Sequence, residues 1–222
     1  MSRPIRVQNV TVTAHEIRKD LHRTYPREKW FRPHKKRILN ILLWLSSSDE
    51  KFSYAQPFSF LAFTIYYVFH NTNESDSMVL TYHALRRIIT VVSPTCPTDA
   101  GDTKPLIFHE SLKSLVRMKL LHIDAGLNDS ISGTMLDLII LNGVPTLFTN
   151  WFDIHGSVHV LDYIIDEDCV TMFSNMVHFL ISLFLTQEVV FTSGFNNEDI
   201  CCLIMSKTIF DPYTVVSRAK SL

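Results

Sequence analysis

The spacing of apolar residues is the feature that most constrains the fold, because they recur every three or four positions along most of the chain. Over residues 34–47 the apolar side chains fall on one helical face, which predicts an amphipathic helix. Over residues 57–70 apolar and aromatic side chains occupy every face, which predicts a helix buried in the core. No useful length of sequence alternates as a strand does, so the predicted fold class is all-α.

A stretch rich in Pro, Thr and Asp at 94–105 is the one plausible internal boundary. We therefore predict a single helical domain over 1–222, with an N-terminal part over 1–93 and a C-terminal part over 106–222. Residues 71–77 form a further polar break. The remaining predicted apolar-periodic segments are 78–92, 106–121, 131–142, 145–154, 157–166, 170–186, 197–207 (with Asn196 as a candidate cap) and 212–220.

The composition indicates an ordered protein with a sizeable core. The 222 residues are 46% apolar and include only six glycines, which excludes a disordered chain. Four cysteines without a C-x-x-C pair are too few for a disulfide framework and suit reduced thiols in the cytoplasm. The N-terminus lacks the apolar run of a signal peptide. The apolar stretch Met172–Thr186 is shorter than the roughly 20 residues of a membrane span, so we predict a buried core helix there.

Charge is distributed unevenly. Residues 1–51 hold twelve Lys and Arg against five Asp and Glu, whereas residues 52–222 hold nine against seventeen. A basic N-terminal part suits an anionic partner surface, although it is also compatible with an ordinary solvated face. No zinc-finger, RNP-like or helix-turn-helix signature accompanies it, so we expect no nucleic-acid partner.

Two short motifs carry the clearest chemical signal. Residues 17–26 read Ile-Arg-Lys-Asp-Leu-His-Arg-Thr-Tyr-Pro, and Tyr54-Ala55-Gln56 ends thirty-three positions after Arg23. Arginine offers a planar charged fork to phosphate oxygens, and glutamine can orient an attacking water. Periodicity alone leaves simpler interpretations open. Asp20 and Arg23 could form a surface ion pair worth less than about 1 kcal/mol, and Gln56 could be a buried amide or a helix N-terminal residue.

These motifs resemble the two catalytic fingers, I-x-x-D-x-x-R-T-[FY]-P and Y-x-Q, of the TBC family of Rab GTPase-activating proteins. The resemblance implies an irregular multi-helix domain that promotes GTP hydrolysis on a Rab partner in vesicle trafficking. On this resemblance Arg23 and Gln56 are catalytic and act in trans, with Asp20, Thr24 and Tyr54 in support. The first motif matches at Ile17, Asp20, Arg23, Thr24, Tyr25 and Pro26.

The resemblance also assigns a role to each residue. Arg23 neutralises charge that develops on the transferred phosphate, an effect worth about 10³–10⁵ in rate in known GTPases. Gln56 aligns the water, and Asp20 orients the arginine. Tyr54 packs and positions its loop.

Weaker resemblance continues downstream. Trp151-Phe152 and Val160-Leu161-Asp162-Tyr163 are similar to the family's W-F…L-[WY]-D segment, which implies structural roles for Trp151 and Asp162, as for Ile17. We expect the tryptophan to pack and the aspartate to satisfy backbone or cap donors. The ending, residues 211–222, resembles the tail of the subfamily acting on early secretory Rabs. That implies a cytoplasmic protein at endoplasmic reticulum or Golgi membranes, held there peripherally through its partner.

The chain departs from the family pattern in two places. Pro57 follows Gln56 where the family has glycine, and only sixteen residues precede Ile17. We therefore expect a domain shortened at its N-terminus. The departures keep a second hypothesis open, a catalytically inactive TBC-like binding module or scaffold, and a third is an unrelated helical adaptor.

No active site for a substrate of its own is predicted. The chain contains neither G-x-x-x-x-G-K-[ST] nor G-x-S-x-G, so GTP and Mg²⁺ would arrive on the partner and no cofactor belongs to the chain. His155 and His159 are separated by Gly156 and do not form an H-E-x-x-H motif. The acidic run 166–168 does not fit a calcium loop. We therefore predict no metal site.

Overall fold

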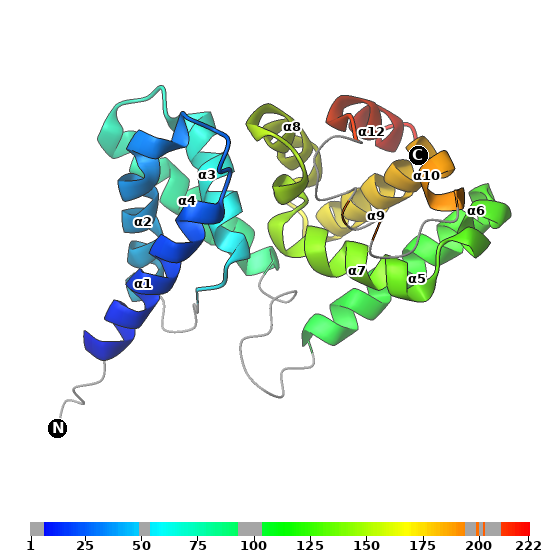
Figure 1. Ribbon diagram of the computed structural model, residues 1–222, viewed down its shortest axis with the longest axis horizontal. Coiled ribbons are helices and arrows are strands. Elements are labelled where there is room, and N and C mark those ends of the chain that lie inside the picture. The colour runs from blue at the N-terminus through cyan, green and yellow to red at the C-terminus, as the bar shows by residue number, and fades with distance from the viewer. Residues whose placement is uncertain (1–6, 49–53, 93–103, 194–198, 200–201, 203–209) are drawn as a thin grey trace. The chain divides into compact units, whose positions relative to one another are not determined.

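The computed structural model describes residues 7–48, 54–92, 104–193, 199, 202 and 210–222. Every regular element in these residues is a helix, which confirms the all-α fold (Figure 1). The chain divides into two compact units, Met1–Thr90 and Val91–Leu222. This division lies close to the predicted end of the N-terminal part at residue 93, and the description of the chain as a single domain stays a prediction.

Within the described residues the first unit contains four helices, of which the first two are amphipathic. They are α1 (Val7–Arg23), α2 (Phe31–Ser48), α3 (Pro57–Phe69) and α4 (Glu74–Val92). Helix α1 packs against α2 and α3, and α2 packs against α3. Ile17 is fully buried on the inner face of α1. Helix α3 buries side chains on all sides, as its sequence predicts, and forms the centre of the unit. Its buried residues are Phe58, Ser59, Leu61, Ala62, Phe63, Thr64, Ile65 and Tyr66.

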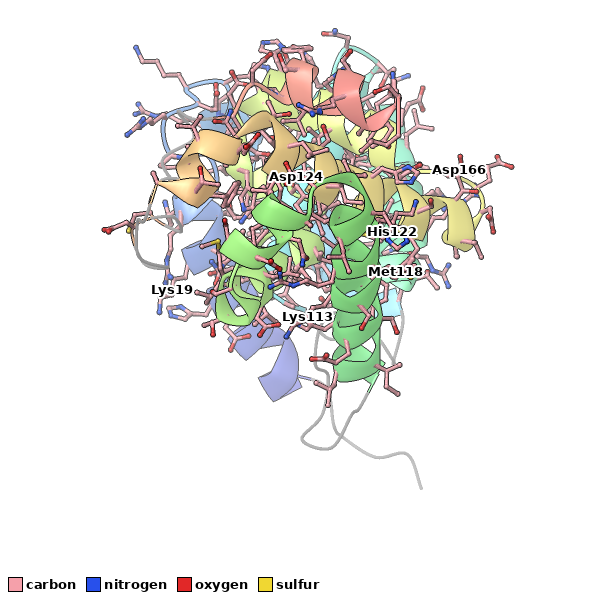
Figure 2. The ribbon with its side chains drawn as sticks, turned by 90° about the vertical axis from the view of Figure 1, so that its right-hand side faces the viewer. Lys19, Lys113, Met118, His122, Asp124 and Asp166 are labelled. Carbon is pink, nitrogen blue, oxygen red and sulfur yellow. The ribbon has the colours of Figure 1, made fainter. Side chains whose placement is uncertain are left out.

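The second unit is built around the long apolar helix α9 (Cys169–Thr186). Figure 2 shows side chains of α5, with Lys113, Met118 and His122 labelled. Helix α9 packs against α5, α8, α10 and α12. The other elements are α5 (Lys104–Ile123), α6 (Ala125–Ser130), α7 (Gly133–Gly143), the 3₁₀ turns η2 (Val144–Thr146) and η3 (Thr149–Trp151), α8 (Ile154–Ile164), α10 (Glu188–Thr192) and α12 (Pro212–Ala219).

By length and composition α9 could cross a membrane, but 56% of its apolar window is already buried inside the protein. Its buried Ser182 hydroxyl donates to the Val215 carbonyl of α12 at 2.6 Å. A helix whose faces pack on four neighbours behaves as a core element, in line with the interpretation of Met172–Thr186 from sequence.

Trp151 is completely buried, with its ring centroid 4.9 Å from that of Phe148. The close approach depends on Gly143, because a Cβ atom there would lie 2.5 Å from the Trp151 ring. Leu147 and Phe148 have positive φ angles of 49° and 63°, so the chain turns here instead of continuing as a helix. The helix predicted over 145–154 is therefore wrong, and two 3₁₀ turns occupy half of it.

The capping role predicted for Asp162 is also wrong. Asp162 lies in the last turn of α8, is exposed, and has no hydrogen bond within the described residues. The end of a helix leaves carbonyl groups unpaired, and a carboxylate cannot donate to them. The cap of α8 is Asp153, whose carboxylate accepts from the Gly156 amide at 2.8 Å.

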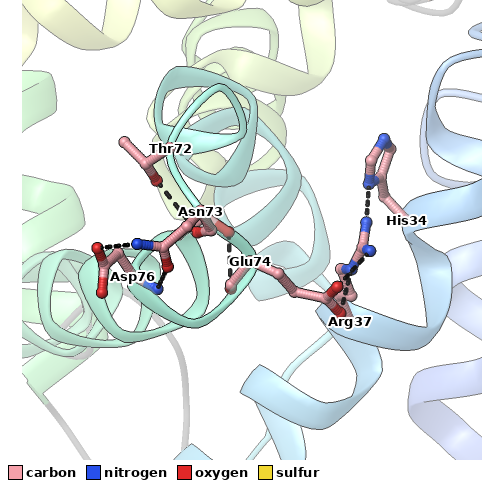
Figure 3. A network of polar contacts seen from close by, with 7 residues as sticks. His34, Arg37, Thr72, Asn73, Glu74 and Asp76 are labelled. Carbon is pink, nitrogen blue, oxygen red and sulfur yellow. Dashed lines mark hydrogen bonds and ion pairs between the residues drawn. The ribbon is translucent and has the colours of Figure 1, made fainter.

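Helix α4 begins at Glu74, four residues before its predicted start. Asn73 makes this possible, because its side-chain oxygen accepts from the Asp76 amide at 2.9 Å (Figure 3). The short helices α6 and α10 were not predicted. Most of the predicted helix 197–207, its cap Asn196 and most of the loop 94–105 lie outside the described residues.

Candidate functional site

Helix α1 ends at Arg23 because the following residues cannot continue it. Tyr25 has a positive φ of 45°, in the left-handed region that ends many helices. Pro26 then removes a backbone donor. The Tyr25 ring is buried 5.0 Å from Phe31, which fixes the turn in the core. Arg23 therefore sits in the last turn of a helix, where the dipole favours a cation.

The Arg23 side chain is exposed, and within the described residues it forms no hydrogen bond or ion pair. The alternative of an Asp20–Arg23 ion pair is not realised. The Asp20 carboxylate instead accepts a hydrogen bond from the Tyr54 hydroxyl at 3.0 Å. Asp20 therefore contacts the second motif directly, and any support it gives to Arg23 acts through the backbone of α1.

Tyr54 is the donor in its hydrogen bond with Asp20. Burial raises the pKa of its hydroxyl well above the ordinary value, and the neighbouring Asp20 carboxylate raises it further. The phenol therefore stays protonated across the physiological range. The bond joins the helix that carries Arg23 to the segment that carries Gln56.

Gln56 precedes the first residue of α3, with φ −50° and ψ −40°. Its side chain is exposed and forms no capping bond to the helix. Pro57 fits the first helical position, because the amide that it lacks is one that a helix leaves unpaired. The proline thus fits the helix start, and the side-chain amide of Gln56 faces solvent.

Two buried hydroxyl pairs join the end of α1 to α3. Thr24 Oγ1 lies 2.7 Å from Ser59 Oγ, and the Tyr25 hydroxyl lies 2.9 Å from Thr64 Oγ1. Ser59 also donates to the Gln56 carbonyl at 2.9 Å. The residues adjoining both predicted fingers are therefore bonded together inside one unit.

Sequence reasoning missed Ser59 and Thr64, because both lie in a segment dominated by apolar residues. They are completely buried. The available signal was their polarity, since a hydroxyl inside an otherwise apolar helix needs a partner. Nothing in the sequence shows that the partners are Thr24 and Tyr25, which lie thirty-five and thirty-nine positions away.

The first unit also carries a set of exposed basic residues that includes Arg23. The exposed cations of α1, the following turn and α2 are Arg18, Lys19, Arg23, Arg27, Lys29, Arg32 and Lys36. Arg37 is not available to a partner in the same way. Its guanidinium binds both carboxylate oxygens of Glu74 at 2.8 Å, and His34 lies 2.9 Å away (Figure 3).

One side-chain cluster in the described residues has the composition of a metal site. Ligand atoms of His109, Glu110 and Asp137 lie within 4.8 Å of one another. The Asp137 carboxylate, however, already accepts from His109 at 2.8 Å and from the Lys113 ammonium at 2.6 Å. A lysine at that distance provides the positive charge that an ion would bring. His159, for which the sequence predicts no metal site, packs its ring 4.6 Å from that of Tyr213.

The second unit has a pocket of about 350 Å³ between α5, α9 and the end of the chain. Lys119 and His178 meet in it, with 2.6 Å between their nitrogen atoms. The pocket is lined by Met118, Lys119, His122, Ile123, His178, Ile181 and Leu222. None of the predicted site residues belongs to it.

Comparison with known proteins bears on the fold and the family of the chain. A solved structure described as the crystal structure of the Ypt/Rab-GAP domain of Gyp1p aligns with a TM-score of 0.71 and 14% sequence identity. The alignment covers 98% of this chain and 75% of that one, and at this identity it speaks for the fold alone. No curated protein matches the sequence significantly. The family model of the Rab-GTPase-TBC domain matches residues 3–189, and the chain therefore belongs to the Rab-GTPase-TBC domain family.

Proposed function

We propose that the protein accelerates GTP hydrolysis on a Rab-type GTPase by supplying Arg23 and Gln56 in trans. Membership of the Rab-GTPase-TBC family implies a Rab GTPase as the partner. The observation that carries the proposal is that both side chains are exposed and unengaged in the described residues, while the residues beside them are bonded together in the core. Polar groups held at rigid element ends without a structural use suit the recognition of a ligand.

Arg23 would act on the charge of the reacting phosphate. Its guanidinium is permanently charged and can donate two parallel hydrogen bonds to phosphate oxygens. Hydrolysis spreads negative charge over the transferred group, so a donor placed there stabilises the transition state more than the ground state. The absence of an intramolecular ion pair in the described residues means that no bond must break first.

Gln56 would orient the attacking water. A primary amide can accept a hydrogen bond from the water and donate another to a phosphate oxygen. Because Gln56 stands directly before α3, its backbone has little freedom, and this limits the positions that the side chain can reach. GTP and Mg²⁺ belong to the partner in this mechanism, so the chain supplies neither a nucleotide site nor a metal.

A second candidate function is a binding module that engages the GTPase without catalysis. Pro57 favours it, because this residue replaces the family's glycine and takes a backbone donor away from the finger. In that case the exposed basic residues of α1, the following turn and α2 would provide affinity, and neither finger would change the rate of hydrolysis.

Single-turnover GTP hydrolysis on a panel of Rab proteins separates these functions. We expect acceleration by the wild type and a large loss with Arg23→Ala or Gln56→Ala, while both variants still bind the GTP-bound partner. Arg87→Ala, which removes an exposed arginine from α4 of the same unit, is the matched control. Equal acceleration by the wild type and both variants would overturn the finger mechanism. Binding without acceleration by the wild type would support the binding module.

We further propose that the protein acts in the cytoplasm at endoplasmic reticulum or Golgi membranes and associates with them through its partner. The support is the likeness of residues 211–222 to the tail of early secretory family members. The Rab panel also tests this assignment. Preferential acceleration of an early secretory Rab would support it, and exclusive action on an endocytic Rab would contradict it.

A further inference from the structure

Two buried hydroxyl groups connect the backbone positions beside the predicted fingers. Thr24 is 1% exposed and Ser59 is completely buried. Thr24 Oγ1 lies 2.8 Å from the Asp20 carbonyl and 2.7 Å from Ser59 Oγ. Ser59 Oγ lies 2.9 Å from the Gln56 carbonyl. A continuous chain of contacts therefore runs from the last turn of α1 to the residue that precedes α3.

The number of hydroxyl protons allows two directions of donation along this chain. Two hydroxyl groups carry two protons, but they make three contacts with two carbonyls and with each other. If Thr24 donates to Ser59, then Ser59 can donate to Gln56. The Asp20 carbonyl remains satisfied, because the Thr24 amide donates to it at 3.0 Å. In the opposite direction Ser59 donates to Thr24 and Thr24 donates to the Asp20 carbonyl, while the Ser59 amide still donates to the Gln56 carbonyl at 3.1 Å. Both directions leave the two carbonyls paired and connect the same two backbone positions.

The backbone conformation of Gln56 depends on its contact with Ser59 more than that of an ordinary residue would. A residue that precedes proline prefers extended backbone angles, because the proline ring crowds its amide and Cβ. Gln56 nevertheless has helical angles, φ −50° and ψ −40°. Ser59 contacts its carbonyl twice, through the amide at 3.1 Å and through the hydroxyl at 2.9 Å, and these contacts hold the carbonyl in that orientation.

We propose that Ser59 is a positioning residue that couples the two fingers. Its hydroxyl fixes the carbonyl of Gln56 and, through Thr24, the last turn of the helix that carries Arg23. Ser59 touches neither nucleotide nor water, and its effect on hydrolysis is exerted through the placement of those two residues. This inference rests on the proposed GTPase-activating function and adds the element that makes Arg23 and Gln56 act as a unit.

The second hydroxyl pair supplies a matched control. The Tyr25 hydroxyl and Thr64 Oγ1 are also buried and also join the end of α1 to α3. Thr64, however, bonds to the carbonyl of Phe60, which is one turn deeper in α3 than the Gln56 carbonyl. Thr64→Val thus disrupts a buried hydroxyl pair between the same elements and leaves the chain from Thr24 to Gln56 in place.

The kinetic test compares Ser59→Ala with Thr64→Val in single-turnover hydrolysis on the Rab that the wild type accelerates most. Misplacement of a catalytic group by a fraction of an ångström to about 1 Å can cost up to about 100-fold in rate. We expect Ser59→Ala to lower the maximal rate about 10–100-fold without changing the half-saturating concentration. Thr64→Val should lose thermal stability and keep the rate. Equal rates in both variants after correction for folded protein would overturn the inference.

Two companion variants probe the route of the coupling. Thr24→Val removes the hydroxyl at nearly constant shape and should reproduce the rate loss, whereas Thr24→Ser keeps the hydroxyl and should restore most of the rate. Pro57→Ala, which frees Gln56 from the preference for extended angles, should recover part of the rate in the Ser59→Ala background. Failure of Pro57→Ala to recover any activity would contradict the dependence of Gln56 on Ser59.

A measurement without a GTPase distinguishes failure of this inference from failure of the proposed function. We expect NMR order parameters of the backbone amides of Gln56 and Thr24 to fall in Ser59→Ala and to stay at wild-type values in Thr64→Val. If the wild type accelerates no Rab, the activating function is wrong, and these order parameters still decide the coupling. Unchanged order parameters in Ser59→Ala would overturn it.

Discussion

The start of α3 in the first unit uses its polar side chain differently from five helix starts in the second unit. In the second unit the side chain before each of five helices accepts a hydrogen bond from a backbone amide of the first turn. In the first unit Asn73 caps α4 in the same way, whereas Gln56 holds the equivalent place before α3 and its side-chain amide forms no such bond. The five caps are Asp124 of α6, Ser132 of α7, Asp153 of α8, Asp168 of α9 and Asp211 of α12.

The difference separates residues that stabilise the fold from residues that remain available to a partner. A cap contributes about 1 kcal/mol to a helix, so an uncapped start forgoes that stabilisation. Gln56 and Arg23 share this property of being exposed polar groups without a structural bond in the described residues. Substitutions in the two classes should therefore have opposite effects on activity and stability.

The largest expected effect is the loss of activity in Arg23→Ala. Removal of an arginine finger should slow stimulated GTP hydrolysis by about 10³-fold or more. Because the side chain forms no bond within the described residues, we expect the unfolding free energy to change by less than about 0.5 kcal/mol. Single-turnover hydrolysis and urea denaturation measure the two quantities. A large loss of stability would show that Arg23 belongs to the structural class.

Gly143→Ala should show the reverse behaviour. A Cβ atom at this position would lie 2.5 Å from the buried Trp151 ring, so packing in the second unit must shift. Overpacking of this kind costs about 1–3 kcal/mol. Gly133→Ala is the control, because no neighbouring atom lies within 4 Å of the place that its methyl group would take. Thermal unfolding should distinguish the two alanines, and equal stability of both would contradict the packing described for Trp151.

The direct comparison of helix starts pairs Asp153→Ala with Gln56→Ala. Asp153 accepts from the Gly156 amide, and its loss should cost about 1 kcal/mol of unfolding free energy. Gln56→Ala should change that free energy by less than about 0.5 kcal/mol, because no capping bond is lost. Urea denaturation of the two variants checks this difference. Similar losses in both would show that the Gln56 side chain contributes to the fold.

The smallest effect concerns acid stability. The amide and hydroxyl of Thr171 lower the pKa of the Asp168 carboxyl, and the Thr214 hydroxyl lowers that of Asp211. Because both pKa values are lower in the folded chain, the folded state binds fewer protons than the unfolded state. Their contribution is complete above the ordinary value of 3.8 and is lost as the pH falls through the lowered folded values.

We therefore expect the double variant Asp168→Asn and Asp211→Asn to flatten the acid dependence of unfolding below about pH 4. Denaturation at a series of pH values measures this slope. Asp162→Asn is the control, because that exposed carboxylate has no hydrogen bond in the described residues. An equal change in slope with the control would mean that the caps are not responsible.

Most of the fold could be predicted from sequence because it depends on local periodicity. Helices α3 and α9 follow their apolar runs to within one residue. The failures occur where tertiary contacts decide. The pair of positive φ angles at Leu147 and Phe148 depends on the packing of Phe148 and Trp151 against Gly143, which local propensity does not report.

The sequence names the candidate site residues, which stay a prediction, but not the contacts that connect them. The motifs place Arg23 and Gln56 in the sequence, yet the bond from Tyr54 to Asp20 and the buried contact of Thr24 with Ser59 emerge only from the packing of α1 on α3. Hydrogen bonds between positions more than thirty residues apart have no local signature. For the same reason the role expected of Asp162 was wrong, since its place at the end of α8 could not be read from its motif.

The left-handed turn at Tyr25 limits how the predicted arginine finger could be transferred to another protein. A glycine would adopt φ 45° at lower cost, but it would remove the ring that packs on Phe31 and the hydroxyl that meets Thr64. The orientation of Arg23 thus depends on the Tyr25 side chain, two positions away, and on the residues that it contacts, Phe31 on α2 and Thr64 on α3. A designed scaffold that copied only the helix and its terminal arginine would contain the guanidinium but not the turn that orients it.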